Sequence, residues 1–188
     1  GPASGSIDVS EFRGCENLKY VTAANPSLKI TGGAVDTSYT FDSFKADVPA
    51  EFYLESVDSS QFHTCATNNY MAFSYLNSDG TKQNLYELTV QETSGKKAVY
   101  RVNSSNQLVY CEFDSGLETV TMPDTVGPYQ ITVIGSGIFR NNCYLRRITI
   151  PSSITTIEDS AFKGCHNLKD VIFKEPVNVT SIGTDAFK

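Results

Sequence analysis

Histidine and cysteine are among the residues whose side chains most often perform nucleophilic or acid–base catalysis. The chain has two histidines, His63 and His166, and five cysteines. A catalytic pair needs a base within hydrogen-bonding reach of its nucleophile. Cys165 and His166 are adjacent, and neighbouring side chains in a turn usually diverge, so no thiol–imidazole pair is expected. His63 is expected on the surface of a short helix. The sequence therefore predicts no catalytic residues and no enzyme.

Two short motifs are similar to cation-binding or phosphate-binding loops, but each lacks a required residue. Asn77-Ser-Asp79-Gly80 is similar to part of a calcium loop, without the downstream glutamate that completes the coordination. Gly135-Ser-Gly137 has Arg140 where a dinucleotide-binding loop has its third glycine. We therefore expect neither a metal site nor a bound cofactor, and we interpret both motifs as turns.

The cysteines lack the spacing of a metal site, and their odd number argues against a disulfide framework. Cys15 and Cys165 both follow a glycine at the same step of a repeated pattern. We expect these two to be buried free thiols, because a small, weakly apolar side chain fits such a turn. A disulfide between Cys65 and Cys111 is left open, because connectivity cannot be deduced from a sequence.

Composition and charge exclude several classes of protein. The 188 residues are 40% hydrophobic and 19% charged, which is typical of a folded chain of one domain or two small ones. The chain has no apolar run of the ~18 residues that a membrane-spanning helix needs, so direct membrane insertion is not expected. The net charge of −6 gives no basic surface for phosphates. Nucleic acid is therefore not an expected partner.

A repeat of 23 residues organises the C-terminal part of the chain. Three types of apolar residue recur at this spacing: Ile134 and Ile157, Phe139 and Phe162, and Leu145 and Leu168. Such a period indicates a solenoid, in which each copy buries its apolar face against a neighbour. In each copy, Leu-x-x-Ile-x-Ile predicts a short strand, and Ile-x-x-x-Ala-Phe fits a turn of helix on the return side. Pro151 ends one strand, and Gly164 permits the positive φ of a turn.

Two further copies follow the same pattern. One begins at Leu117 and contains an insertion around Gly127, and the other spans residues 7–21. Their template is Ile157-Glu-Asp-Ser-Ala-Phe162-Lys-Gly164-Cys165-His-Asn167-Leu168-Lys-Asp-Val171. These segments resemble the BspA-type (Treponema pallidum type) leucine-rich repeat, which is common in bacterial surface proteins.

The repeat and the resemblance predict an α/β solenoid, a short leucine-rich repeat array with parallel strands, interrupted by a small β-meander with one short helix. We expect an N-terminal leucine-rich repeat segment at 7–50, the helix and meander at 51–114, and C-terminal leucine-rich repeats at 115–188. Residues 1–6 are interpreted as a cloning remnant, and the chain is expected to be a fragment of a longer protein.

Phe62, Cys65 and Ala66 have helical spacing, which predicts a helix over 59–69. Meander strands are predicted at 71–76, 85–90, 98–102 and 108–113, where polar turns separate the apolar segments. The meander is expected to cap the repeats. If it instead binds a ligand, Tyr86 and Tyr100 are its first candidates.

Repeat strands at 117–122, 145–150 and 168–173 are predicted to form a parallel sheet that stacks Val120, Ile148 and Val171. One side chain in two would then face outward. The outward residues, a candidate binding face, are Tyr20, Thr22, Thr119, Thr121, Arg147, Thr149, Asp170 and Ile172. The Arg147 guanidinium could make paired hydrogen bonds to carboxylates or sulfates. An ion pair with Asp170, or a merely solvated face, is the alternative.

With no catalytic residues predicted, the resemblance implies a non-catalytic bacterial module that is extracellular or at the cell surface. The expected function is adhesin-like binding of a host or neighbouring-cell protein or glycan. The alternative is a structural spacer or stalk within a larger multidomain surface protein.

Overall fold

A computed structural model describes residues 5–23, 25–33, 37–49, 52–58 and 60–188, so residues 1–4 of the expected cloning remnant lie outside it. The chain divides into two compact units, Gly1–Leu88 and Thr89–Lys188, here called the N-terminal and C-terminal units. The boundary falls within strand β6 (Lys82–Gln91). The regular structure is mostly strand, with two α-helices among the described residues.

The C-terminal unit contains the predicted parallel sheet of the repeats. Its strands are β9 (Thr119–Thr121), β13 (Arg147–Ile150) and β15 (Asp170–Phe173), in the order β15-β13-β9. Ile148 pairs with Val120 on one side and with Val171 on the other, which confirms the predicted column. Val120 and Ile148 are fully buried, whereas Val171, on the outermost strand, is half-buried.

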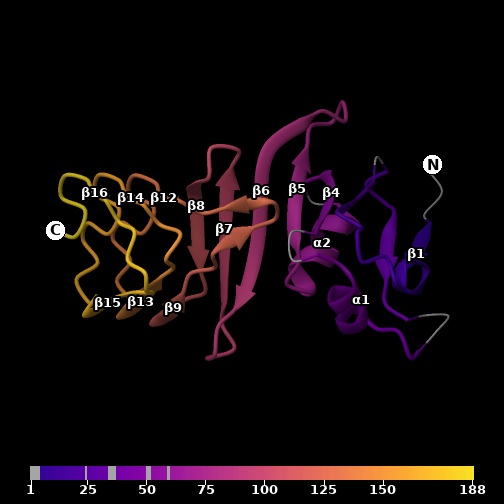
Figure 1. The fold of residues 1–188 in the computed structure, drawn as a ribbon, viewed down its shortest axis with the longest axis horizontal. Coiled ribbons are helices and arrows are strands. Elements are labelled where there is room, and N and C mark those ends of the chain that lie inside the picture. The colour runs from indigo at the N-terminus through magenta and orange to yellow at the C-terminus, as the bar shows by residue number, and fades with distance from the viewer. Residues whose placement is uncertain (1–4, 24, 34–36, 50–51, 59) are drawn as a thin grey trace. The chain divides into compact units, whose positions relative to one another are not determined.

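The return side of the repeats consists of short strands and turns, so the expected turn of helix is wrong. The strands β12 (Val133–Ile134), β14 (Thr156–Ile157) and β16 (Ser181–Ile182) run parallel and align Ile134, Ile157 and Ile182. Figure 1 shows them along one side of the unit, with β9, β13 and β15 along the other. Three residues after each isoleucine, Gly137, Ser160 and Asp185 have φ of 66°, 57° and 57°. A residue in the left-handed region cannot continue a right-handed helix.

The phenylalanines of successive copies stack on one another. The ring centroids of Phe139 and Phe162 are 4.7 Å apart, and those of Phe162 and Phe187 are 4.9 Å apart with an angle of only 4° between the planes. Such offset aromatic contacts add to the area that the rings bury. The spacing of these anchors, 23 residues from Phe139 to Phe162 and 25 from Phe162 to Phe187, therefore corresponds to direct contact between copies.

The predicted insertion around Gly127 forms a tight hairpin. Its strands are β10 (Thr125–Val126) and β11 (Tyr129–Gln130), which pair antiparallel. Gly127 has φ 56°, a conformation that glycine adopts without steric cost.

The predicted meander strands in this unit are also present. β7 (Lys97–Asn103) pairs antiparallel with β8 (Gln107–Phe113), and β8 then pairs in parallel with β12 of the repeats. Side chains alternate between buried and half-buried along β7. Leu108 lies beside Ile134, so the meander continues the isoleucine column of the repeats.

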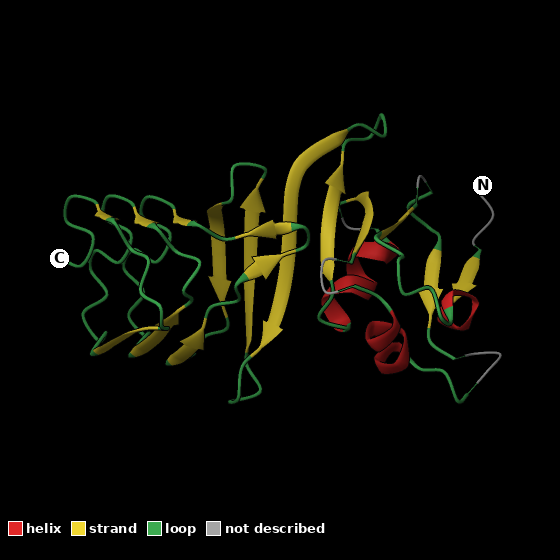
Figure 2. Cartoon of the chain, viewed as in Figure 1, coloured by secondary structure: helices red, strands yellow, loops and turns green. Residues whose placement is uncertain are grey.

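The N-terminal unit has two small sets of strands and both α-helices (Figure 2). Its elements are β1 (Ser6–Asp8), the 3-10 helix η1 (Val9–Phe12), β2 (Tyr20–Thr22), β3 (Lys29–Thr31), α1 (Phe41–Asp47), β4 (Tyr53–Val57), α2 (Gln61–Asn68) and β5 (Ala72–Leu76). β1 pairs with β3, and β4 pairs with β2 and β5, all in parallel. β6 then pairs antiparallel with β5.

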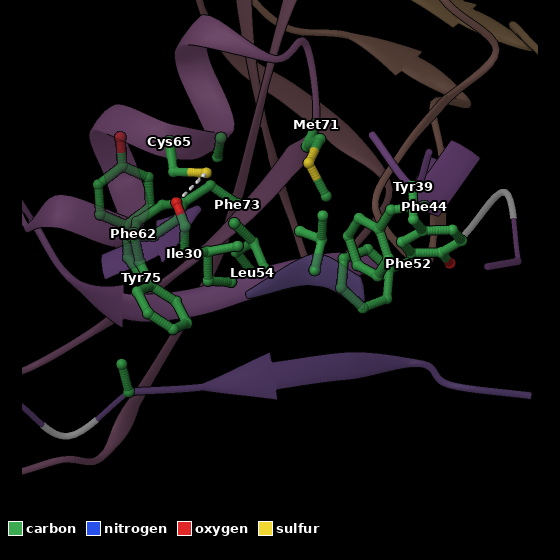
Figure 3. Packing of buried hydrophobic residues seen from close by; sticks show 13 residues of the cluster. Ile30, Tyr39, Phe44, Phe52, Leu54, Phe62, Cys65, Met71, Phe73 and Tyr75 are labelled. Atoms are coloured by element: carbon green, nitrogen blue, oxygen red, sulfur yellow. Dashed lines mark hydrogen bonds between the residues drawn. The ribbon is translucent and has the colours of Figure 1, made fainter. Parts of the chain in front are cut away.

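The sequence predicts one of the two helices and not the other. α2 lies within the predicted range, with Ser60 capping its first turn and Phe62, Cys65 and Ala66 buried. α1 was not predicted. It is a seven-residue helix capped by Thr40, with Phe44 fully buried. Figure 3 shows Phe44, Phe62 and Cys65 packed with Leu54 and other residues of the core.

Residues 7–21 have the turn hydrogen bonds of the repeat at 157–171. The N–H of Cys15 donates to the carbonyl of the phenylalanine three residues earlier at 3.0 Å, and that of Cys165 does so at 3.2 Å. The leucine three residues later donates to the cysteine carbonyl at 2.9 Å in both copies. The preceding glycines, Gly14 and Gly164, have φ of 72° and 76°, as predicted.

Candidate binding surface

Six of the eight candidate residues lie on the outer face of the β9-β13-β15 sheet. We call this set the outer row: Thr119, Thr121, Arg147, Thr149, Asp170 and Ile172. Arg147 pairs in register with Thr119 and Asp170, and the next outward residue of β13 pairs with Thr121 and Ile172. All six are exposed or half-buried, and Ile172 is 45% exposed. The sheet therefore brings together two ranks of three side chains.

Arg147 and Asp170 form the ion pair that the sequence left as an alternative. The Nε and Nη2 atoms of Arg147 donate to Oδ2 of Asp170 at 2.9 and 2.7 Å. The two side chains are about half exposed, so the pair itself contributes under ~1 kcal/mol. Its effect is to fix the orientation of the guanidinium on the sheet.

Tyr20 and Thr22 belong to a different sheet. They lie on β2, which pairs with β4 in the N-terminal unit. Tyr20 is 48% exposed and stacks on Tyr53 at 5.4 Å, and the Lys82 Nζ lies 4.9 Å from its ring centroid. These two residues are therefore not part of the outer row.

Beside Thr22, a buried glutamate is fully compensated. Glu55 is 3% exposed, and its Oε2 lies 3.0 Å from the Lys82 Nζ. The hydroxyls of Thr22 and Ser74 donate to its two carboxylate oxygens at 3.0 and 3.3 Å. The hydrogen bond to Glu55 raises the pKa of Lys82. This carboxylate thus has a cation and two donors.

A hollow of about 310 Å³ adjoins the outer row at β9. It is lined by Glu92, Thr93, Ser94, Gly116, Glu118, Thr119 and Thr121. Glu92 is 9% exposed, and its Oε1 accepts a hydrogen bond from the Thr121 N–H at 3.1 Å. Burial raises the pKa of the Glu92 carboxyl above its ordinary value, against the smaller lowering effect of that hydrogen bond.

His63 is half-buried in a polar network, so its expected place on the surface is wrong. Its ring stacks on Phe73 at 4.6 Å, its Nε2 lies 2.9 Å from Oε1 of Glu87, and its Nδ1 lies 3.1 Å from Asp58. The Tyr75 hydroxyl donates to the other oxygen of Glu87 at 2.5 Å. No sequence signal identifies this cluster, because its members lie on α2, β5 and β6 and at the turn residue Asp58.

All five cysteines are free thiols, so Cys65 and Cys111 are not paired. Burial raises the pKa of Cys65 to about 11. Cys165 is buried as predicted, and its thiol donates to the Phe139 carbonyl at 2.9 Å, while its neighbour His166 is exposed. Cys15 is exposed, which corrects the prediction. Residues of the preceding copy cover Cys165, and in the described part of the chain no such copy covers Cys15.

The two candidate tyrosines of the meander, Tyr86 and Tyr100, are not available as a binding face. Tyr86 is 4% exposed and Tyr100 is fully buried.

Among the described residues, no group of three or more histidines, cysteines, aspartates or glutamates has the geometry to hold a metal ion. None of the helices in the described ranges is long and apolar enough to cross a membrane.

Comparisons with known proteins bear on the C-terminal unit above all. A family model described as the BspA type leucine-rich repeat region matches residues 103–188, with six copies. Residues 7–21 lie outside the match. No curated protein matches the chain.

Three solved structures are similar to parts of the chain. A leucine-rich cell surface protein of Faecalibacterium prausnitzii is 28% identical over 53% of this chain, with a TM-score of 0.41. A leucine-rich repeat protein of Bacteroides capillosus is 26% identical over 50%, and the leucine-rich repeat protein of T. pallidum is 18% identical over 47%, both with TM-scores of 0.38. The matches span 27%, 70% and 52% of those three proteins, respectively.

The family match covers the segment in which β12, β13, β14 and the later strands repeat at the observed period. Residues 103–188 of this chain therefore match the BspA type leucine-rich repeat family.

Proposed function

We propose that this chain is a non-catalytic module of a bacterial surface or secreted protein, which binds a protein or glycan of a host or neighbouring cell through the outer row. The observation that carries the proposal is the register of β9, β13 and β15, which aligns two ranks of exposed side chains on one sheet. The family assignment of residues 103–188 supports a binding role, because leucine-rich repeats typically bind proteins.

The physical reason is preorganisation. Side chains on a sheet lose only their own rotamer freedom when a partner binds, since the backbone is already fixed. Asp170 occupies two of the five N–H donors of Arg147, and the remaining donors can reach a carboxylate or sulfate of a ligand. Ile172 adds an exposed apolar side chain beside the charged pair. The row thus combines one oriented cation, hydroxyls and an apolar contact.

A spacer role is the second candidate, and the Arg147–Asp170 pair favours it. Arg147 and Asp170 already neutralise each other, so neither side chain requires a charged ligand. A spacer predicts that changes in the outer row leave every binding property of the chain unchanged.

Charge reversal at Arg147 separates the two. The chain is applied to immobilised extracellular-matrix proteins and mucin glycoproteins, and each captured ligand is then titrated against Arg147→Glu. We expect at least about tenfold weaker binding with a melting temperature near that of the parent. The matched control is Arg140→Glu, which makes the same charge change at an exposed turn residue away from the row. Equal affinity of parent and Arg147→Glu would contradict the proposal.

A further inference from the structure

The described residues include three buried glutamates, and they differ in their polar partners. Glu55 has the ammonium group of Lys82, and Glu87 has the His63 ring at 2.9 Å and the Tyr75 hydroxyl as hydrogen-bond partners. Glu92 has one hydrogen bond, from the Thr121 N–H to Oε1. In the described part of the chain, no lysine, arginine or histidine lies within ion-pair distance of Glu92, and its Oε2 has no hydrogen-bond partner. A buried carboxylate that is not paired destabilises a fold.

This carboxylate lines the hollow beside β9. The other polar side chains of the hollow are the hydroxyls of Thr93, Ser94, Thr119 and Thr121 and the carboxylate of Glu118. None of the lining residues is basic, although the Lys96 Nζ, which donates to the Ser115 carbonyl, lies beside the lining residue Gly116. Glu118 is itself exposed and has Arg146 at 3.3 Å, so Glu92 is the buried anion without a counter-charge. The hollow therefore offers an anion and several hydrogen-bond acceptors to an incoming cation.

We propose that the hollow is a subsite for a primary ammonium group, the side chain of a lysine on a bound protein. This inference rests on the proposed function, because Thr119 and Thr121 belong both to the outer row and to the hollow. An ammonium group has three N–H donors and no acceptor, which matches a carboxylate surrounded by hydroxyls. A volume of about 310 Å³ admits a lysine side chain, and the outer row would hold the surrounding surface of the partner.

The Thr121 amide is a built-in reporter, because it donates to Glu92. The probe is Nα-acetyl-L-lysine methylamide, titrated into the ¹⁵N-labelled chain at neutral pH and low salt. The expected result is a saturable shift of the Thr121 amide resonance, with a dissociation constant on the order of millimolar for so small a ligand. The analogue with an acetylated Nε has no charge and should leave this resonance unchanged.

Two variants make the test specific. Glu92→Gln keeps the shape and the acceptor for Thr121, and it should weaken probe binding at least about tenfold. Glu112→Gln removes a carboxylate from an exposed position on β8 outside the hollow, and it should bind the probe like the parent. Equal binding by the parent and Glu92→Gln, or no shift at Thr121 in the parent, overturns the inference. A shift with glucosamine but not with the lysine probe would overturn the assignment to a protein ligand.

The titration uses no macromolecule, so its outcome is independent of the Arg147→Glu test. If the probe does not bind but Arg147→Glu still loses its captured ligand, the subsite is ruled out and the proposed function stands. Probe binding without any captured macromolecule has the opposite meaning: the subsite stands and the outer row fails.

Discussion

At the scale of single residues, long-range pairing decides which polar side chains are buried. The sequence places His63 in a helix correctly, but its partner Glu87 lies 24 positions away on β6. The helical spacing of Phe62, Cys65 and Ala66 predicts only which side of α2 is buried, and His63 lies next to that side. The same limit applies to Cys15 and Cys165, whose motifs are alike: Cys165 is buried against Phe139 of the preceding copy, whereas Cys15 is exposed.

Glu92 gives a residue-scale prediction about stability and pH. Its pKa is raised above the ordinary 4.5, so the folded state holds its proton more tightly than the unfolded state does. The free energy of unfolding then falls as the pH rises from 4.5 through the folded-state pKa. Glu92→Gln does not lose this free energy, because glutamine does not ionise. We therefore expect the variant to be more stable than the parent at neutral pH, and we expect the difference in free energy of unfolding to shrink as the pH falls toward 4.

Urea unfolding at several pH values measures this difference. Glu112→Gln is the control, because it makes the same change of side chain at an exposed position. A Glu92→Gln protein that is less stable than the parent at neutral pH would show that Glu92 is compensated in the free protein and has no need of a cation.

At the scale of elements, the repeated contacts are the ones that the sequence predicts most fully. The pairing of β13 with β15 and the stacking of Phe139 on Phe162 follow from the 23-residue period, because each copy repeats the same contacts. The spacing of five residues between Ile and Phe predicts a helical turn on the return side. The sequence does not indicate that Ser160 and Asp185 adopt a left-handed conformation, because non-glycine residues rarely do so.

The stacked column gives the element-scale prediction. Ile148 is fully buried between Val120 and Val171, so Ile148→Ala should lower the free energy of unfolding by about 2–5 kcal/mol. Thr119→Ala changes an exposed residue on the next strand and should stay within about 0.5 kcal/mol of the parent. Chemical denaturation of the three proteins measures both values. An Ile148→Ala variant as stable as the parent would mean that the register of the sheet is wrong.

At the scale of the whole molecule, the C-terminal unit was more predictable than the N-terminal unit. Its repeats specify strand, turn and neighbour together, and the family match covers the same residues. In the N-terminal unit, α1 has a single fully buried side chain, Phe44, which is too weak a periodic signal to predict a helix. The candidate site divided in the same way: six residues share one sheet, and Tyr20 and Thr22, which were aligned by a distant copy, lie on another.

The hollow beside β9 was not predictable from sequence. Glu92 follows β6, and Thr121 lies on β9, so the hydrogen bond between them depends on how the meander packs against the first repeat strand. Neither residue has a motif, and the repeat pattern includes only Thr121.

The outer row contains four methyl-bearing residues, Thr119, Thr121, Thr149 and Ile172, and these allow the central claim to be tested directly. The chain is labelled at threonine and isoleucine methyl groups and titrated with a ligand captured from matrix or mucin, while methyl resonances are followed by NMR. We predict that the largest shifts fall on these four residues and that the return-side threonines Thr155, Thr156 and Thr180 change little. Shifts concentrated on the return side, with the four outer-row methyl groups unchanged, would contradict binding through the β9-β13-β15 face.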